Sequence, residues 1–295
     1  MVIVKLLIVD GHAYAYRAFH AIRNLRGPEG RPTNAIYGFV KMLEKLRAAL
    51  EPAGLTVVWD GGLSAERRAA LPEYKAQRPE MPEDLRAQLD EIVSYLAAAG
   101  MASYCGDGVE ADDYIACLAR RAADAGWNAV IASADKDFMQ LVSARIGLWN
   151  PNDKTATVWT REQVRAKAGV EPEQVAGWLA LMGDAVDNIP GVPGVGPKTA
   201  AGLLQQFGSV AALFARLAEV QPEKLRAALR DSAEVVRRNL RLVQLQEVPC
   251  EFVPEQLAVR PADREQLRDL FRRWGFKGMI ESLDRPGSGQ QAELI

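Results

Sequence analysis

The sequence predicts an α/β protein with a mostly parallel central sheet flanked by helices, followed by a helical C-terminal part. Short apolar runs alternate with longer segments of helical periodicity through about residue 160, which is the pattern of βαβ units. Three of the apolar runs, residues 6–9, 56–59 and 129–132, are followed closely by aspartate. Beyond Thr160 we find no further strand pattern, and helical spacing dominates.

Apolar residues at helical spacing predict two helices between the expected strands, at about residues 35–50 and 111–125. The segment 66–82 is different, because it is rich in charge and has no regular apolar period. We expect it to be an exposed and mobile excursion between sheet and helix. Further along, Thr160 followed by Gln163 three residues later fits a capping box at the start of the helical part.

The composition indicates a globular chain and leaves few catalytic chemistries open. The 295 residues carry a net charge of −2, with 48% hydrophobic and 25% charged residues. Basic stretches at residues 216–241 and 260–277 offset the acidic groups, so nucleic acid is not excluded, since its contact needs local positive charge. The chain has only two histidines, His12 and His20, which disfavours a zinc site or a Ser-His-Asp triad.

The cysteines and the N-terminus indicate a cytoplasmic protein. Cys105, Cys117 and Cys250 are odd in number, far apart and form no CxxC pair, so we expect reduced thiols. We expect Cys105 and Cys117 to be buried. The apolar stretch before Asp10 is too short for a signal peptide, and no run is long enough to span a membrane.

Carboxylates gather where the predicted sheet would present residues at one rim. In a parallel sheet, residues just past the carboxyl ends of the strands converge on one crevice. So many carboxylates could not all stay ionised there without cations, because like charges raise each other's pKa. Oxygen ligands without histidine or thiol favour hard cations such as Mg²⁺ or Mn²⁺, and two such ions are the usual machinery of phosphodiester hydrolysis. The nine residues are Asp10, Asp60, Glu110, Asp112, Asp113, Asp135, Asp137, Asp184 and Asp187.

Each of these groups also has a plain structural interpretation. An acidic residue at a strand end is often a solvated loop residue or a helix cap. The group 110–113 could merely favour the positive end of a helix dipole, and the group 135–137 could be a turn with a local ion pair. Five separate acidic groups, each at a predicted strand or helix end, are better explained by one shared site than by five independent structural roles.

A glycine-rich motif at residues 191–200, GVPGVGPKTA, is the most specific short signal in the chain. Pro197 suits the first position of a helix that would run to about Phe207, with Gly208 as its stop. Such a turn presents free N–H groups to a phosphate, and Lys198 adds a charge beside them. The alternative is a glycine-rich helix connection without a ligand, but its nearness to Asp184 and Asp187 favours a phosphate clamp.

Taken together, these motifs resemble those of the 5′ nuclease (flap endonuclease) family, whose members include the 5′-3′ exonuclease domain of bacterial DNA polymerase I and its stand-alone homologues. The resemblance extends from Lys5 to about Leu283. It is carried by VDG at 9–11, YRAFH at 16–20, YKAQR at 74–78, EADD at 110–113, ADKD at 134–137, GD and DN within 183–188, and the motif at 191–200.

The resemblance implies a 5′ nuclease (PIN-like) fold and roles for the carboxylates. It implies that one divalent ion, Mg²⁺ or Mn²⁺, is served by Asp10, Asp60, Glu110 and Asp112. A second ion would be served, in part through water, by Asp113, Asp135, Asp137, Asp184 and Asp187.

The resemblance also implies residues that bind the substrate. Residues 66–82 would form a helical arch from which Lys75 and Arg78 reach the scissile phosphate, and Arg17 would hold the phosphate or the 5′ strand. Residues 191–207 would be a helix-turn-helix clamp on duplex DNA that also holds a K⁺ ion through backbone carbonyls. The DNA-binding positions expected in it are Gly191, Gly194, Gly196, Lys198 and Thr199.

The expected domains are an α/β catalytic core at residues 1–160, a helical part at 161–284 that completes the metal site, and a flexible tail at 285–295. Two positions depart from the family pattern. Trp59 stands where phenylalanine is usual, and Glu66 stands where an apolar residue is common.

The activity implied is that of a 5′-3′ exonuclease and structure-specific flap endonuclease in primer removal and repair, leaving 5′-phosphate and 3′-hydroxyl. Branched or flap duplex DNA with 5′ ends, or an RNA primer on DNA, would be the partner of a monomeric enzyme. Two alternatives stay open: an RNA-primer or RNase H-like nuclease of the same superfamily, and a non-catalytic protein that binds branched DNA. The full set of carboxylates disfavours the second.

Overall fold

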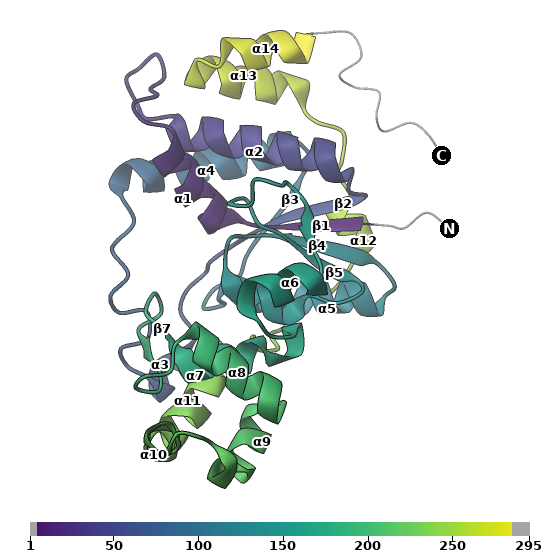
Figure 1. Ribbon diagram of the computed structural model, residues 1–295. Coiled ribbons are helices and arrows are strands. Elements are labelled where there is room, and N and C mark those ends of the chain that lie inside the picture. Colours follow the sequence, from purple (N-terminus) through teal and green to yellow (C-terminus); the bar gives the residue numbers. More distant parts are fainter. Residues whose placement is uncertain (1–4, 285–295) are drawn as a thin grey trace. The chain divides into compact units, whose positions relative to one another are not determined.

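The computed structural model describes residues 5–284, which form two compact units (Figure 1). Neither unit is continuous in the sequence. Unit 1 takes residues 5–60, 80–105 and 251–284 of the described chain, and unit 2 takes residues 61–79 and 106–250. The division predicted at residue 160 stays a prediction.

Unit 1 contains three parallel strands in the order β3 (Ala102–Cys105), β2 (Gly54–Trp59), β1 (Lys5–Asp10). Leu6 is paired with Gly54 and Asp10 with Val58, so β1 and β2 end at the same edge. From Leu6 onwards β1 is buried, and so is all of β2, which explains why their sequences are continuously apolar rather than alternating.

Helices cover these strands within unit 1. The long helix α2 packs against both α1 and α4, and α13 packs against α14 and α4 (Figure 1). Asn34 and Gln88, both buried, satisfy backbone groups at the ends of α1 and α2. The helices of unit 1 in the described chain are α1 (Gly11–Ala21), α2 (Asn34–Leu50), α4 (Glu83–Ala98), α12 (Pro254–Leu257), α13 (Arg264–Trp274) and α14 (Lys277–Asp284).

Unit 2 contains β4 (Asn128–Ala132) and β5 (Ile146–Trp149), which are parallel, and β6 (Val158–Trp159), which is antiparallel to β5. A separate antiparallel pair, β7 (Gly183–Asp184) and β8 (Ile189–Pro190), closes a small hairpin. The helices of unit 2 in the described chain are α3 (Ala65–Ala70), α5 (Ala111–Asp124), η1 (Lys136–Leu141), α6 (Arg161–Ala168), η2 (Pro172–Gln174), α7 (Val175–Met182), α8 (Pro197–Phe207), α9 (Val210–Ala215), η3 (Leu217–Glu219), α10 (Glu223–Asp231) and α11 (Ala233–Val243).

Several local predictions are confirmed. The helices expected at 35–50 and 111–125 are α2 and α5, and the capping box of Thr160 and Gln163 opens α6. Helix α8 begins at Pro197 and is stopped by Gly208, as expected. None of the helices within residues 5–284 combines the length and apolar character that crossing a lipid bilayer requires.

Two predictions are wrong. Strands do occur after Thr160, but β7 and β8 have two residues each, too few to leave a period in the sequence. Cys105 is exposed rather than buried, because β3 is the outermost strand of unit 1 and its side chains alternate between half-buried and exposed. Cys117 is buried, as expected.

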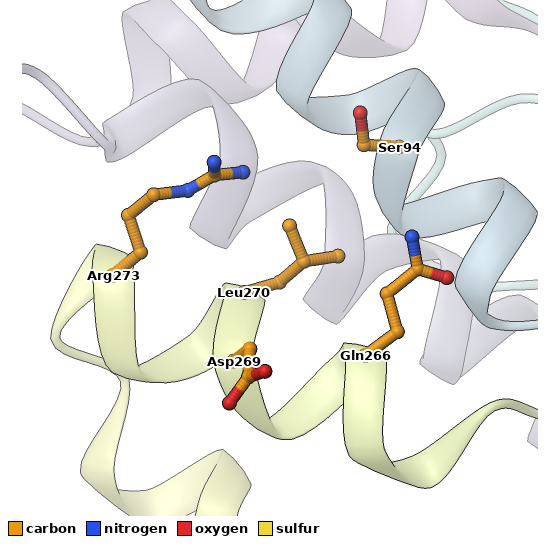
Figure 2. Close-up of a pocket in the computed structure, with 5 residues that line it drawn as sticks. All are labelled: Ser94, Gln266, Asp269, Leu270 and Arg273. Carbon is orange, nitrogen blue, oxygen red and sulfur yellow. The ribbon is translucent and has the colours of Figure 1, made fainter.

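A hollow of about 400 Å³ lies between α4 and α13 of unit 1 (Figure 2). Its lining is Ser94, Gln266, Asp269, Leu270 and Arg273. Ligand pockets are usually lined mainly by apolar and aromatic side chains. With Leu270 as its single apolar lining residue, the hollow lacks that character, and the predicted site residues are not part of it.

Candidate metal centre

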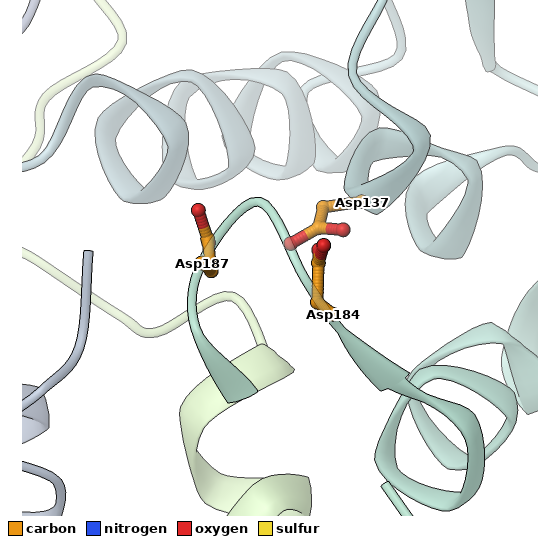
Figure 3. Close-up of side chains that lie close together, drawn as sticks. All are labelled: Asp137, Asp184 and Asp187. Atoms are coloured by element: carbon orange, nitrogen blue, oxygen red, sulfur yellow. The ribbon is translucent and has the colours of Figure 1, made fainter. Parts of the chain in front are cut away.

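Three aspartate side chains of unit 2 lie close together (Figure 3). Each of Asp137, Asp184 and Asp187 offers a carboxylate oxygen, and these oxygens all lie within 4.8 Å of one another. Asp137 Oδ1 is buried and meets no hydrogen-bond donor within residues 5–284. Burial raises the pKa of Asp137 well above its ordinary value, and the neighbouring carboxyl of Asp135 raises it further. A divalent cation would satisfy all three carboxylates at once.

The hairpin β7–β8 places two of these aspartates by a close backbone crossing. Gly183 has φ +77°, and a Cβ on Gly191 would lie 2.1 Å from the Met182 carbonyl oxygen. Glycine is needed at position 183 for the positive φ and at position 191 for the close backbone contact. The loop between Gly183 and Gly191 therefore closes tightly, and it holds Asp184 and Asp187 near each other. Asp184 also accepts a hydrogen bond from Lys136 Nζ at 2.7 Å.

A second acidic group lies at the N-terminus of α5. The Glu110 side chain is buried and accepts hydrogen bonds from the Ser64 backbone N–H at 2.8 Å, from Lys75 Nζ at 2.6 Å and from the Tyr74 hydroxyl at 3.2 Å. Burial alone would raise the pKa of Glu110, but Lys75 and Arg67 outweigh it, so this pKa is lowered. Asp112 Oδ2 lies 3.9 Å from Lys75 Nζ. Glu110 is thus a carboxylate kept ionised by cations of the protein itself.

Asp113 has a different environment from its neighbours. Its Oδ2 accepts from Arg67 Nη1 at 2.7 Å, and its Oδ1 accepts from Arg67 Nη2 at 2.8 Å and from the Gln246 backbone N–H at 2.8 Å. Both side chains of this pair are 3% exposed. Both oxygens are therefore engaged by the protein, and the metal role expected for Asp113 stays a prediction.

The charged segment that includes Lys75 and Arg78 is packed against the aspartate loop. The backbone N–H of Lys75 donates to the Asp187 carbonyl at 3.0 Å, and Arg78 Nη2 donates to Asp187 Oδ1 at 2.6 Å. Asn188 Nδ2 donates to the Glu73 carbonyl at 2.9 Å. The expectation that this segment is exposed throughout is wrong for Arg67 and Lys75, which are buried. Their partners are carboxylates rather than apolar groups, so burial left no apolar period in the sequence.

In unit 1, Asp10 ends β1, and Asp60 follows its paired strand β2 at the same edge. Asp10 is 7% exposed and caps α1 by accepting the Ala13 N–H at 3.0 Å. The N–H of Asp60 donates to His12 Nδ1 at 3.0 Å, which leaves the proton of the neutral ring on Nε2. Burial lowers the pKa of His12, although the charge of Asp60 opposes this. Arg17 is exposed on α1, the helix that Asp10 caps.

The glycine-rich motif, residues 191–200, has buried anchors and an exposed turn. Val192 and Val195 are buried and anchor it, while Gly194, Gly196 and Lys198 are exposed. A Cβ on Gly194 or Gly196 would meet no atom of the described chain within 4 Å. Gly196 is the N-cap of the eleven-residue helix α8 and supplies no capping side chain, so the first N–H groups of the helix are open to a partner.

Comparison with known proteins assigns nearly the whole chain. Residues 5–169 match the family model "5′-3′ exonuclease, N-terminal resolvase-like domain", and residues 170–265 match "5′-3′ exonuclease, C-terminal SAM fold". The chain belongs to the 5′-3′ exonuclease family. The predictions of this family, of a 5′ nuclease fold and of a nuclease are confirmed.

Curated relatives of the 5′-3′ exonuclease family support the assignment over the full length. The 5′-3′ exonuclease of Aquifex aeolicus is 38% identical over 282 residues, which are 95% of either chain. DNA polymerase I of Bacillus caldotenax is 37% identical over 293 residues, which are 98% of this chain and 33% of that protein. The chain thus spans about a third of the length of the DNA polymerase I that it matches.

Solved structures share the fold. The T5 D15 protein co-crystallised with metal ions has a TM-score of 0.69 at 24% identity, covering 95% of this chain and 99% of its own. The T5 5′-exonuclease with bound zinc has a TM-score of 0.68 at 25% identity, covering 95% and 96%. The catalytic core of Rad2 in complex with DNA has a TM-score of 0.65 at 18% identity, covering 96% and 92%.

Three side chains that bond to the candidate carboxylates were not predicted from the sequence. Arg67 pairs with Asp113, Tyr74 donates to Glu110, and Lys136 donates to Asp184. Arg67 lies within the charged segment, where nothing in the local pattern distinguishes it from a solvated residue, whereas Tyr74 opens the motif YKAQR at 74–78. Lys136 could have been found, because a lysine between two aspartates expected to bind metal needs an acidic partner of its own.

Proposed function

We propose that this chain is a metal-dependent 5′-3′ exonuclease and structure-specific flap endonuclease that hydrolyses DNA phosphodiesters to 5′-phosphate and 3′-hydroxyl, in primer removal and repair. The observation that carries the proposal is the convergence of Asp137, Asp184 and Asp187, with Asp137 Oδ1 buried and lacking a donor within residues 5–284. Three carboxylates this close together, two of them on buried residues, are strongly unfavourable unless cations compensate them.

Two Mg²⁺ or Mn²⁺ ions fit the donor set, because it consists of carboxylate oxygens. Asp137, Asp184 and Asp187 would hold one, together with Asp135. Glu110 and Asp112 would be ligands of the other ion. Asp10 and Asp60 of unit 1 would bind metal as well. When bound, such ions supply an activated water and stabilise charge on the phosphate and the leaving oxygen.

The protein's own cations would act on the substrate. In the described structure Lys75 Nζ is bound to Glu110 and Arg78 to Asp187, so both are held beside the carboxylates. We infer that they turn to the scissile phosphate when the carboxylates have other counter-ions, and that they then stabilise its developing charge. Arg17, exposed on α1, would bind the 5′ strand.

Duplex DNA would be gripped by the glycine-rich motif. The exposed Gly194, Gly196 and Lys198 and the open N-terminus of α8 fit contacts to phosphate rather than to bases. A K⁺ ion held by carbonyls of this turn would strengthen the grip. Structures of T5 D15 flap endonuclease and of Rad2 were determined with DNA, which supports DNA as the partner. We further propose that the enzyme acts as a monomer and accepts an RNA primer on DNA.

The test compares the cleavage of a 5′-flap DNA, an RNA–DNA hybrid and a single strand under single-turnover conditions in Mg²⁺, Ca²⁺ and EDTA. Asp112→Asn should lower the rate by about 10²- to 10³-fold or more, as for loss of a preorganised electrostatic group. Asp124→Asn is the matched control, because Asp124 is exposed at the other end of α5.

Four outcomes would refute the proposal. Cleavage of flap DNA in EDTA would show that the reaction does not require a divalent metal. A normal cleavage rate for Asp112→Asn would show that Asp112 is not a ligand of the catalytic metal. Binding of branched DNA without any cleavage in Mg²⁺ would assign the chain to the non-catalytic class, and preference for the RNA strand would assign it to the RNA-directed nucleases.

A further inference from the structure

Residues 239–246, which we name the α11 bracket, comprise the last turns of α11 and the segment that follows. The bracket contains no carboxylate and none of the predicted site residues. It nevertheless forms hydrogen bonds with three elements of unit 2 that carry candidate metal ligands, namely the β7–β8 hairpin, η1 and the N-terminal end of α5. These elements are distant from the bracket in the sequence, so their common contact is a property of the fold.

The first contact is made by Asn239, which is fully buried. Its Nδ2 donates to the Pro190 carbonyl at 2.7 Å and to the Ala180 carbonyl at 3.1 Å. Pro190 ends β8, the strand that closes the loop with Asp184 and Asp187, and Ala180 lies on the helix that leads into that loop. One side chain therefore fixes both ends of the aspartate loop.

The second contact is made by Gln140 on η1. Its Nε2 donates to the Val243 carbonyl at 3.0 Å, and its Oε1 accepts the Leu245 N–H at 3.2 Å. Asp137 lies three residues earlier on the same 3₁₀ helix. Residues three apart in a 3₁₀ helix lie one above the other, so the rotation that Gln140 fixes also sets the direction of Asp137.

The third contact is made by Arg67 and Asp113. Arg67 Nε donates to the Leu242 carbonyl at 3.0 Å and its Nη2 to the Gln244 carbonyl at 3.1 Å. The same guanidinium binds both oxygens of Asp113 and lies 3.3 Å from Glu110 Oε2, while the Gln246 N–H donates to Asp113. The carbonyls at the end of α11 are thus joined to the start of α5 by a planar, buried cation.

We propose that the α11 bracket holds the three ligand-bearing elements in register, so that metal affinity depends on a segment that supplies no ligand. The positioning residues are Asn239 of the bracket and two residues that bond to it, Gln140 and Arg67. Without a metal, the carboxylates repel one another and would separate unless their backbones were held. Metal sites tolerate deviations of only about 0.2 Å in ligand distance, so small shifts of these elements weaken binding. The inference rests on the proposed metal-dependent function.

The test replaces Gln140, which bonds to the bracket, and a matched glutamine that does not. Gln174 is also half-buried, donates to the carbonyls of Leu204 and Gly208 at the end of α8, and accepts the Glu171 N–H. Gln140→Met and Gln174→Met therefore lose the same kind of contact. The full chain without DNA is titrated with Mn²⁺ in a calorimeter, and the thermal midpoint is measured in EDTA.

Both variants should lose a few degrees of thermal midpoint. Mn²⁺ affinity should fall only in Gln140→Met, by about 10- to 100-fold, which is the usual effect of removing a group that supports a metal ligand. Arg67→Lys gives an independent variant, because it keeps a charge beside Glu110 but cannot span both Asp113 and the α11 carbonyls. Its Mn²⁺ affinity should fall as well.

Equal Mn²⁺ affinity in Gln140→Met and Gln174→Met, or wild-type affinity in Arg67→Lys, would overturn the inference. If Gln140→Met did not fold, Arg67→Lys would decide alone, since it retains the positive charge. If the wild-type chain bound no Mn²⁺ in this assay, the proposed function itself would be wrong, which is a different result from a bracket without effect.

Discussion

Lys75 offers a sharp test of how the protein balances its buried carboxylates. Its Nζ lies 2.6 Å from Glu110 Oε2 and 3.9 Å from Asp112 Oδ2, and its side chain is 2% exposed. Burial alone would lower the pKa of Lys75, but Asp112, Tyr74 and Glu110 together raise it, so the ammonium is charged. Lys75→Met keeps the length of the side chain and removes the charge, which leaves Glu110 buried with Arg67 at 3.3 Å as its remaining cation.

The expected loss of stability follows from this geometry. Coulomb's law at an effective dielectric constant of about 20 gives about 6 kcal/mol for charges 2.6 Å apart. The desolvation of the ammonium offsets part of this, and removing one partner of a buried pair generally costs about 3–5 kcal/mol. Because Arg67 still faces Glu110, we expect the lower value, about 3 kcal/mol, which lowers the thermal midpoint by about 6–12 °C.

The assay is thermal unfolding of Lys75→Met in EDTA and in saturating Mg²⁺. A bound dication would replace the missing charge, so the deficit of the variant should shrink in Mg²⁺. Lys41→Met is the control, because Lys41 forms an ion pair of 2.8 Å with Glu44 but is 52% exposed. It should cost less than about 1 kcal/mol in either buffer. An equal deficit of Lys75→Met with and without Mg²⁺ would refute the idea that metal and lysine share these carboxylates.

Metal affinity should rise with pH, because burial and Asp135 raise the pKa of Asp137 and a protonated carboxyl cannot bind a cation. Calorimetry of Mn²⁺ binding in two buffers of different ionisation enthalpy measures the protons released on binding. This proton release should decrease as the pH rises. If no protons were released at any pH, the raised pKa of Asp137 would be contradicted. In the glycine-rich motif, Gly196→Ala should leave thermal stability intact, because a Cβ there meets no atom of residues 5–284 within 4 Å and φ is −97°. The same variant should weaken duplex binding, because the added methyl group blocks close approach of the DNA backbone. Lys198→Ala should reduce the salt slope of duplex affinity by about one unit, and wild-type affinity and slope in both variants would show that the motif only connects helices.

The fold was largely predictable because its signals are local. Buried parallel strands gave unbroken apolar runs at β1 and β2, and α8 was bounded by Pro197 and Gly208. The contacts that hold the candidate site are not local. Arg67 meets the Leu242 carbonyl 175 residues away, and no periodicity records a bond between a side chain and a distant backbone oxygen. The motifs therefore predict which carboxylates bind metal, whereas the groups that orient and neutralise these carboxylates are found in the structure alone.

The crossing of Gly183 and Gly191 has a consequence for the whole reaction. The same few atoms of backbone that close the loop of Asp184 and Asp187 also begin the glycine-rich motif proposed to grip the duplex. On the proposed function, the distance between the bound duplex and the cleaved bond would therefore be set by the backbone at this point. The enzyme would then cut at a fixed distance from the bound duplex. The position of the cut would not depend on the base sequence on either side.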